Sequence, residues 1–322
     1  MKKFFILLIV LMLLSLFLVA CRHAPSATSD DAIRVVCTSF APYDWIREIV
    51  GDKHTNVSIH YLNEKGLDMH NYMPSAKDII SIHESDFFIY VGGESENWVS
   101  DVLKNANHSS QIVLNMMTFL EEDLKTNEEM PHSHDEDHHE DEHAHAEEYD
   151  EHVWLSIQNA KRYCAEIVSI LCSLDASNAE YYQANGASYL SKLNALDAQY
   201  LEMVEQAPHK TLLFGDQFPF RYLVEDYHLE HYAVFSGCSA DSEVSFDTII
   251  YHAKKLDELG LQAVCAIENS DQKVAKTIIQ NTQSKNQIIH VLNSMQRVSG
   301  TSDKNFLDIM TDNLHILKKA MQ

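Results

Sequence analysis

The stretch that decides the fold is 177–206, SNAEYYQANGASYLSKLNALDAQYLEMVEQ, which contains a single glycine, Gly186. Apolar side chains recur in it every three or four residues, the spacing of one buried helix face. The members of that face are Tyr189, Leu193, Leu196, Tyr200 and Met203. Ser177 fits an N-cap because Glu180 follows three residues later, and Pro208 marks the end. A helix of this length spans roughly 45 Å, so we assign 177–207 to a rigid connector between two domains.

Short apolar runs alternate with helical stretches on both sides of this connector. The expected strands are Ile33–Thr38, Val57–Leu62, Asp86–Val91, Gln111–Asn115, Thr211–Phe214, Tyr232–Phe235, Ala263–Glu268 and Ile288–Leu292. The expected helices are Tyr43–Val50, Ser75–Ser85, Asn97–Asn105, Phe220–Tyr227, Ser245–Leu259, Lys273–Thr282 and Asn305–Met321. Such alternation implies parallel sheets with helices on both faces. We therefore predict an α/β protein of two doubly wound lobes, residues 33–176 and 208–322.

The N-terminal segment 1–21 reads as an export signal. Two lysines precede a long apolar run that is short for a membrane-spanning helix. The run ends in Leu18-Val19-Ala20-Cys21, which resembles a bacterial lipobox with Cys21 as the lipidated residue. The alternative is a plain signal peptide with an incidental cysteine. With the polar stretch 22–32 as a tether, we expect a lipid-anchored protein on the extracytoplasmic face of the cell membrane.

The acidic segment 121–151 has an unusual composition. The chain carries a net charge of −24, and this segment holds fifteen carboxylates and one lysine, which excludes a nucleic-acid binder. Within it, 131–146 (PHSHDEDHHEDEHAHA) cannot bury a core and should be a solvated loop. Its six histidines are His132, His134, His138, His139, His143 and His145. Imidazole binds zinc, copper, nickel and iron, so we interpret the loop as a weak metal collector. The alternatives are a purification tag or an acidic loop without a task.

Two further histidines have more structured surroundings. His70 lies in GLDMHNYMPSAKD (66–78), between an expected strand and a helix that Pro74 would open as its first residue. His152 lies in EHVWLSIQNAKRY (151–163), directly after the acidic segment and directly before an amphipathic helix. Ligands of open α/β sheets bind beyond the carboxyl ends of the strands. We predict that the two imidazoles meet at a cleft and bind one divalent cation.

These motifs together resemble a known family. The pattern GxxxHxYxPSxxD around His70, the HVWLS at His152, the connecting helix and the lipobox resemble the metal-specific receptors of bacterial ABC importers. These are the cluster A-I solute-binding proteins, whose zinc-handling branch carries a histidine-rich acidic loop before the HVW motif. The resemblance covers nearly all of 33–322. It implies two lobes joined by one rigid helix, one metal ion in the cleft, a membrane permease as partner, and a monomeric receptor rather than an enzyme.

The resemblance also implies two further ligands, and here the chain departs from the pattern. The third family ligand is a histidine or carboxylate three residues before a phenylalanine, but counting back from Phe220 gives Gln217. We expect Asp216 to substitute, and the alternative is a site with three protein ligands and water. The fourth ligand follows a strand that ends in glutamate. Asp271 matches it best and Glu268 is the alternative, although Asp271 could equally be a helix N-cap.

The donor set favours zinc as the bound ion. Two imidazoles with one or two carboxylates fit tetrahedral Zn²⁺, whereas oxygen-rich sites suit Mn²⁺. Losing the third histidine shifts the set toward oxygen, so a manganese or iron receptor is the alternative.

A zinc hydrolase is the rival from another class, but the chain has no HExxH and no general base beside His70 or His152. A surface adhesin would need an exposed partner-binding patch that the sequence does not reveal.

Overall fold

The computed structural model describes residues 32–51, 56–105, 110–126, 149–235 and 244–322. The predicted signal peptide, Cys21, the tether apart from its last residue, and the histidine-rich stretch 131–146 lie outside these ranges. Within them, no helix combines the length and the apolar character that crossing a membrane requires.

The N-terminal lobe is built on a parallel sheet of order β2-β1-β3-β4. Its strands are β1 (Ile33–Cys37), β2 (Val57–Tyr61), β3 (Phe87–Tyr90) and β4 (Ile112–Asn115). Its helices are α2 (Phe40–Val50), α3 (Ala76–His83), α4 (Trp98–Lys104), α5 (Met116–Leu120) and α6 (Ile157–Leu174). Side chains alternate across a strand, so Val35 and Cys37 pack with α2 and α6, whereas Val36 packs with α3 and α4.

The C-terminal lobe repeats this arrangement with a parallel sheet of order β6-β5-β7-β8. Its strands are β5 (Thr211–Phe214), β6 (Glu230–Ala233), β7 (Ala263–Ile267) and β8 (Ile288–Leu292). Its helices are α8 (Arg221–Asp226), α9 (Phe246–Leu259), α10 (Lys273–Gln280) and α11 (Phe306–Ala320). The prediction of two doubly wound lobes is confirmed. Strand β6 begins and ends two residues earlier than expected.

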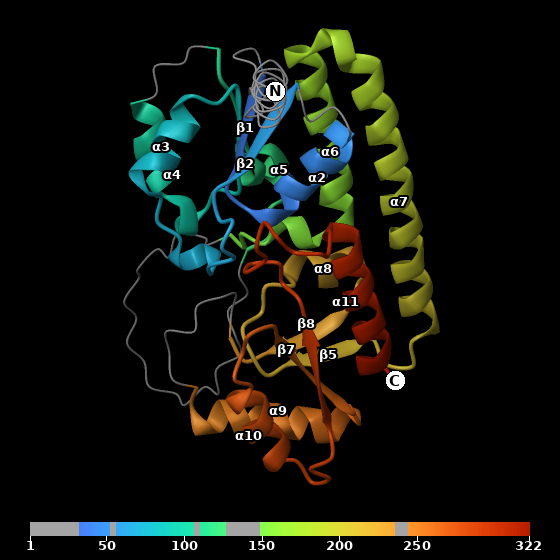
Figure 1. Ribbon diagram of the computed structural model, residues 1–322. Coiled ribbons are helices and arrows are strands. Elements are labelled where there is room, and N and C mark those ends of the chain that lie inside the picture. Colours follow the sequence, from blue (N-terminus) through green and yellow to red (C-terminus); the bar gives the residue numbers. More distant parts are fainter. Residues whose placement is uncertain (1–31, 52–55, 106–109, 127–148, 236–243) are drawn as a thin grey trace, which may run out of the picture.

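The connector is α7 (Ala179–Gln206), a helix of 28 residues that runs beside both lobes (Figure 1). Its predicted apolar face is buried and packs against α2, α6 and α11. Gly186 is required where α7 crosses α6, because a Cβ there would lie 2.4 Å from Cγ2 of Val168. The helix therefore ties the backs of the two lobes together.

Two expected helix starts are wrong. Ser177 does not cap α7, because its hydroxyl donates to Asp175 Oδ1 at 2.6 Å and a short 3-10 turn precedes the helix. Pro74 is not the first residue of α3. Ser75 is the N-cap, since its hydroxyl accepts from the backbone of Asp78, whose carboxylate accepts from Ser75 in return. The capping box moves the helix start past the proline.

One hydrophobic core extends through both lobes. The Trp45 ring of α2 meets the edge of the Phe306 ring of α11 at 5.2 Å between centroids. The buried Asp44 carboxylate accepts from the backbone N–H of Phe306 at 2.9 Å, at the start of α11. These contacts fix the lobes relative to each other, and loops that follow β2, β3 and β8 meet between them.

Candidate metal centre between the lobes

His70 lies on a short 3-10 helix, η2 (Met69–Asn71), between β2 and α3. Asp68 caps this turn, because its Oδ1 accepts from the backbone N–H of His70 at 3.1 Å. Its other oxygen accepts two hydrogen bonds from the Arg297 guanidinium. Arg297 belongs to the loop after β8, so the C-terminal lobe helps to hold the turn that carries His70.

His152 is oriented by a carboxylate two residues earlier. Asp150 Oδ1 accepts from the backbone N–H of His152 at 2.8 Å and from its ring Nδ1 at 3.0 Å. Because a carboxylate only accepts, Nδ1 carries the hydrogen and Nε2 presents its lone pair. The next aromatic residue, Trp154, is buried as predicted and donates from Nε1 to the Ser294 carbonyl at 2.9 Å. The ring of His152 is thus held in one tautomer and one direction.

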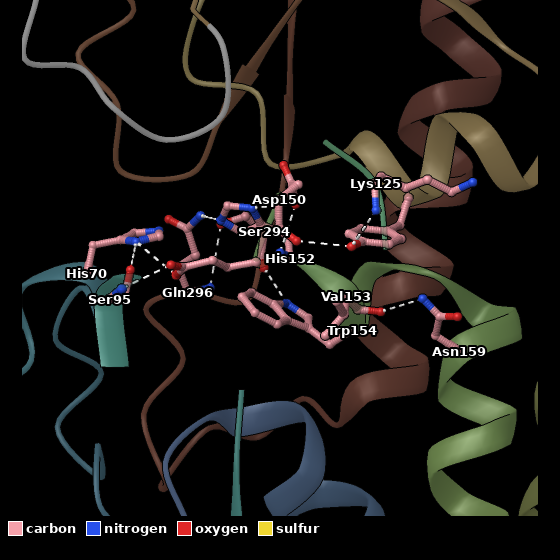
Figure 2. Close-up of polar contacts among 12 residues, drawn as sticks. His70, Ser95, Lys125, Asp150, His152, Val153, Trp154, Asn159, Ser294 and Gln296 are labelled. Atoms are coloured by element: carbon pink, nitrogen blue, oxygen red, sulfur yellow. Dashed lines mark hydrogen bonds and ion pairs between the residues drawn. The ribbon is translucent and has the colours of Figure 1, made fainter. Parts of the chain in front are cut away.

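The structure brings the two predicted histidines together, with ring centroids 5.4 Å apart and planes inclined by 58° (Figure 2). His70 Nδ1 lies 2.6 Å from Ser95 Oγ and 3.9 Å from Glu151 Oε2. Its Nε2 is buried and has no hydrogen-bond partner among the described residues. A buried imidazole nitrogen without a partner costs free energy, so this pair fits a cation that would bind both Nε2 atoms. Within the described ranges, no third histidine, cysteine or carboxylate completes a metal-binding cluster.

Carboxylates make the back of this site electronegative. Glu151 Oε1 accepts from the backbone N–H of Ser95 at 2.9 Å, and its Oε2 is buried without a hydrogen-bond partner in the described part of the chain. Glu96 accepts from the backbone N–H of Gly92 at 2.9 Å. Burial raises the pKa of Glu96 to about 7, and the charge of Glu151 adds to the effect. A cation beside His70 would be stabilised by Glu151, whose Oε2 lies 3.9 Å from His70 Nδ1.

Gln296 is, with Glu151, a residue of the site that sequence reasoning missed. Its Nε2 donates to His152 Nε2 at 2.7 Å, and the residue is only 3% exposed (Figure 2). Ser294 supports the same loop, because its N–H and hydroxyl donate to the two oxygens of Glu268 at 2.8 and 2.7 Å. A glutamine has no metal-binding signature. The one available signal was its place after a strand, at the carboxyl end of the sheet.

Asp216 lies at the carboxyl end of β5. Its Oδ1 accepts from the backbone N–H of Gln217 at 2.9 Å, and its Oδ2 lies 3.4 Å from the backbone nitrogen of Ile267 in β7. No hydrogen bond or ion pair joins Asp216 to His70 or His152 in the described residues. Its carboxylate faces the neighbouring strand end.

Asp271 and Glu268 have opposite surroundings. The Asp271 side chain is 61% exposed and forms an ion pair with Lys273 at 2.6 Å. Its Oδ1 also accepts from the Lys273 backbone N–H, and these contacts hold the pKa of Asp271 below its usual value. Glu268 is largely buried, and burial raises its pKa. Neither carboxylate has a hydrogen bond or ion pair to the histidine pair within the described ranges.

The ends of the acidic segment meet at the C-terminal lobe. Thr126 and Tyr149 pair in an antiparallel bridge. The Tyr222 hydroxyl of α8 accepts from the backbone N–H of Lys125 at 3.1 Å and donates to the carbonyl of Asp150 at 3.0 Å. Asp150 is also the residue that orients His152. The Tyr222 hydroxyl therefore joins Lys125 and Asp150, which lie on either side of the stretch 131–146 in the sequence, at the base of the metal centre.

Two parallel-sheet lobes, one long connecting helix and a histidine pair between the lobes define a solute-binding receptor of the cluster A-I class. The chain belongs to the family described as "Zinc-uptake complex component A periplasmic", whose profile matches residues 35–320. The resemblance inferred from the motifs is confirmed.

Named relatives agree with this assignment. The chain is 29% identical over 325 residues to the zinc-binding lipoprotein AdcA of Streptococcus pneumoniae, covering 99% of this chain and 61% of that protein. It is 28% identical over 310 residues to the high-affinity zinc uptake system protein ZnuA of Bacillus subtilis, covering 95% and 94%. The Zn(II)-bound ZnuA-like domain of Streptococcus pneumoniae AdcA superposes with a TM-score of 0.68 at 26% identity, covering 90% and 99%. The chain thus spans 61% of the streptococcal protein's length.

Proposed function

We propose that this protein is an extracytoplasmic receptor that captures Zn²⁺ between its lobes and delivers it to the permease of an ABC importer. One observation carries the proposal: the buried Nε2 of His70, without a partner among the described residues, lies beside the ring of His152. Each imidazole has an oxygen partner at Nδ1, Ser95 Oγ for His70 and Asp150 Oδ1 for His152. Oxygen partners of this kind orient zinc-binding histidines in proteins. The names of the zinc-binding relatives support the same cation.

We infer that His70 and His152 form the tight core of the site. Asp216 stays our proposal for the third ligand, because its weak 3.4 Å contact with Ile267 is easily given up. For the fourth ligand, Asp271 would have to leave its ion pair with Lys273. Water completes the tetrahedral shell wherever a carboxylate does not.

We also propose that the histidines of 131–146 collect Zn²⁺ and pass it to the tight site. Support comes from the placement of the segment's ends, since Tyr149 leads directly into Asp150 and His152.

Lipidation at Cys21 would hold the receptor at the outer face of the cytoplasmic membrane, beside its permease. The protein would act as a monomer.

A manganese or iron receptor of the same design is the second candidate. The oxygen atoms near the pair, above all the buried Oε2 of Glu151, favour it. A hydrolase would need an open coordination position and a base aimed at it, and the chain belongs to a family of receptors.

The test measures metal content and stoichiometry of purified protein lacking residues 131–146. We expect one tightly bound Zn²⁺, which His70→Ala and His152→Ala each abolish. His315→Ala is the matched control, because His315 is an exposed histidine on α11, and it should keep the ion. Tight binding that survives both site variants, or that disappears with the deletion alone, refutes the proposal. Parallel titration with Mn²⁺ decides between the two cations.

A further inference from the structure

His70 can offer Nε2 to a cation only when its ring hydrogen is on Nδ1. The direct partner of Nδ1 is the Ser95 hydroxyl, whose oxygen lies 2.6 Å away (Figure 2). A hydroxyl both donates and accepts, so Ser95 permits either tautomer of the neutral ring. For His152 the choice is made by Asp150, because a carboxylate only accepts. The contact with Ser95 by itself therefore leaves the tautomer of His70 open.

A second group beside Nδ1, the carboxylate of Glu151, can make this choice. Its Oε2 lies 3.9 Å from His70 Nδ1, is buried, and has no hydrogen-bond partner among the described residues. This distance is too long for a hydrogen bond, so Oε2 acts on the ring through its charge. A negative charge attracts an N–H and repels a lone pair, and burial strengthens both effects. The carboxylate therefore favours the hydrogen on Nδ1 and the lone pair on Nε2.

The loop after β3 holds the Glu151 carboxylate in this position. Oε1 accepts from the backbone N–H of Ser95 at 2.9 Å. Gly93 of the same loop has φ +78°, and a Cβ on it would overlap Oε1 of Glu151 and lie 2.6 Å from its Cδ. The carboxylate thus fills the space that a side chain at position 93 would need. The glycine lets Glu151 lie against the loop, and the backbone bond fixes its direction.

We infer that Glu151 is a positioning residue of the metal centre, which keeps the ring hydrogen of His70 on Nδ1 and leaves Nε2 free for the cation. Asp150 does the same for His152. Two consecutive carboxylates therefore orient the two histidines, one each. The inference deepens the proposed function and rests on it, because it assumes a cation at Nε2.

The two carboxylates also strengthen the imidazoles as ligands. A carboxylate behind a histidine raises the basicity of the nitrogen that binds the metal. The effect matters in this chain because Gln217 stands where the family has a third histidine or carboxylate. His70 and His152 thus carry a larger share of the coordination, and the residues that orient them weigh more in the affinity.

The experiment uses the full mature chain and three variants. Glu151→Gln keeps the shape of the side chain, and its oxygen can still accept from Ser95 while its NH₂ replaces Oε2 beside Nδ1. Ser95→Ala removes the hydroxyl but keeps the backbone N–H that Glu151 needs. Glu94→Gln is the control, because it removes the same charge from an exposed position in the same loop. Thermal unfolding confirms that each variant folds.

Long-range ¹H–¹⁵N NMR of the metal-free protein reads the tautomer of His70, at about pH 8, where ordinary imidazoles are neutral. The signals of His70 are those that His70→Ala lacks. We expect the hydrogen on Nδ1 in the wild type, Ser95→Ala and Glu94→Gln, and a shift toward Nε2 in Glu151→Gln. An unchanged tautomer in Glu151→Gln overturns the inference. A shift in Ser95→Ala as large as that in Glu151→Gln overturns it too, since the hydroxyl would then decide.

Zinc affinity, measured by competition with a chelator, is the second readout. We expect Glu151→Gln to bind roughly 10- to 100-fold more weakly, Ser95→Ala to lose less than Glu151→Gln, and Glu94→Gln to match the wild type. An equal loss in Glu94→Gln would reduce the effect to net charge and contradict the positioning role. Absence of tight zinc in the wild type would instead refute the proposed function. The tautomer of His70 is read without metal, so the two failures are distinguishable.

Discussion

Arg297 of the C-terminal lobe holds Asp68 of the N-terminal lobe through two guanidinium hydrogen bonds, and Asp68 in turn caps the turn that carries His70. The next residue toward the N-terminus, Gln296, contacts His152. Two consecutive residues of one loop thus act on both histidines of the candidate centre, Gln296 by direct contact and Arg297 through Asp68. The pairing ties the geometry of the metal centre to contact between the lobes.

Replacing Arg297 with methionine should weaken zinc binding by roughly tenfold, because His70 loses the support of its turn. The Arg297 side chain is 38% exposed, so the free energy of unfolding should fall by only about 0–1 kcal/mol. Chelator competition and urea unfolding measure the two quantities. Arg162→Met, which removes an exposed ion pair with Asp123 in the N-terminal lobe, is the control for the loss of charge. Equal zinc affinities in the two variants would show that the Asp68 pair does not position His70.

Asp150→Asn should lower zinc affinity by roughly 10- to 100-fold. The amide is neutral and can turn its NH₂ toward Nδ1, which would move the ring hydrogen of His152 to Nε2, the metal-binding atom. Isothermal titration of protein lacking 131–146 measures the change, and the nitrogen shifts of His152 report the tautomer. Full affinity with an unchanged tautomer would rule out this role for Asp150.

Tyr222→Phe should lower the free energy of unfolding by about 1–3 kcal/mol, because the buried backbone groups of Lys125 and Asp150 lose their shared partner. Tyr251→Phe is the matched control in the same lobe, since no hydrogen bond to the Tyr251 hydroxyl occurs in the described part of the chain. Urea unfolding compares the two variants. A cost no larger than that of the control would mean that solvent replaces the bridge.

Stability should rise as the pH falls from 7 to 5 because of Asp44. Burial raises the pKa of this carboxyl to about 6 from an ordinary value of 3.8. Between these two values the folded protein binds a proton that the unfolded chain does not, so the stabilisation is complete below the lower value and is lost as pH rises through about 6. The full contribution is at most about 3 kcal/mol.

Asp44→Asn tests this linkage, because the amide mimics the protonated acid and its oxygen can still accept from Phe306. The gain in unfolding free energy from pH 7 to pH 5, measured on metal-free protein, should shrink in the variant. Part of the gain should persist, since burial also raises the pKa of Asp226 to about 6. An undiminished gain in Asp44→Asn would assign the effect to other groups.

Much of the fold could be predicted because its signals are local. The buried face of α7 and the alternating strands and helices follow from hydrophobic spacing, and both match the structure. The errors fall at element ends, where competing side chains decide. The Ser177 hydroxyl donates to Asp175 and therefore does not cap α7. The capping box formed by Ser75 and Asp78 sets the start of α3.

The candidate centre was only half predictable. Motifs in the chain pointed to His70 and His152, and the structure places their rings side by side. Gln296 and Glu151 had no such signal. Gln296 is an ordinary amide, and Glu151 is one of many carboxylates in the acidic segment. Only folding brings each of them beside an imidazole.

The sequence by itself determined the two α/β lobes, the helix that joins them and the two histidines, because hydrophobic periodicity and short motifs act within a few residues of themselves. Only the tertiary structure decided what surrounds those histidines. From the opposite lobe, Gln296 contacts His152 and Arg297 holds Asp68, which caps the turn of His70. The packing of Trp45 on Phe306 sets how the lobes face each other. Contacts between segments so far apart arise from the summed packing of both cores, and no local pattern of residues encodes that sum.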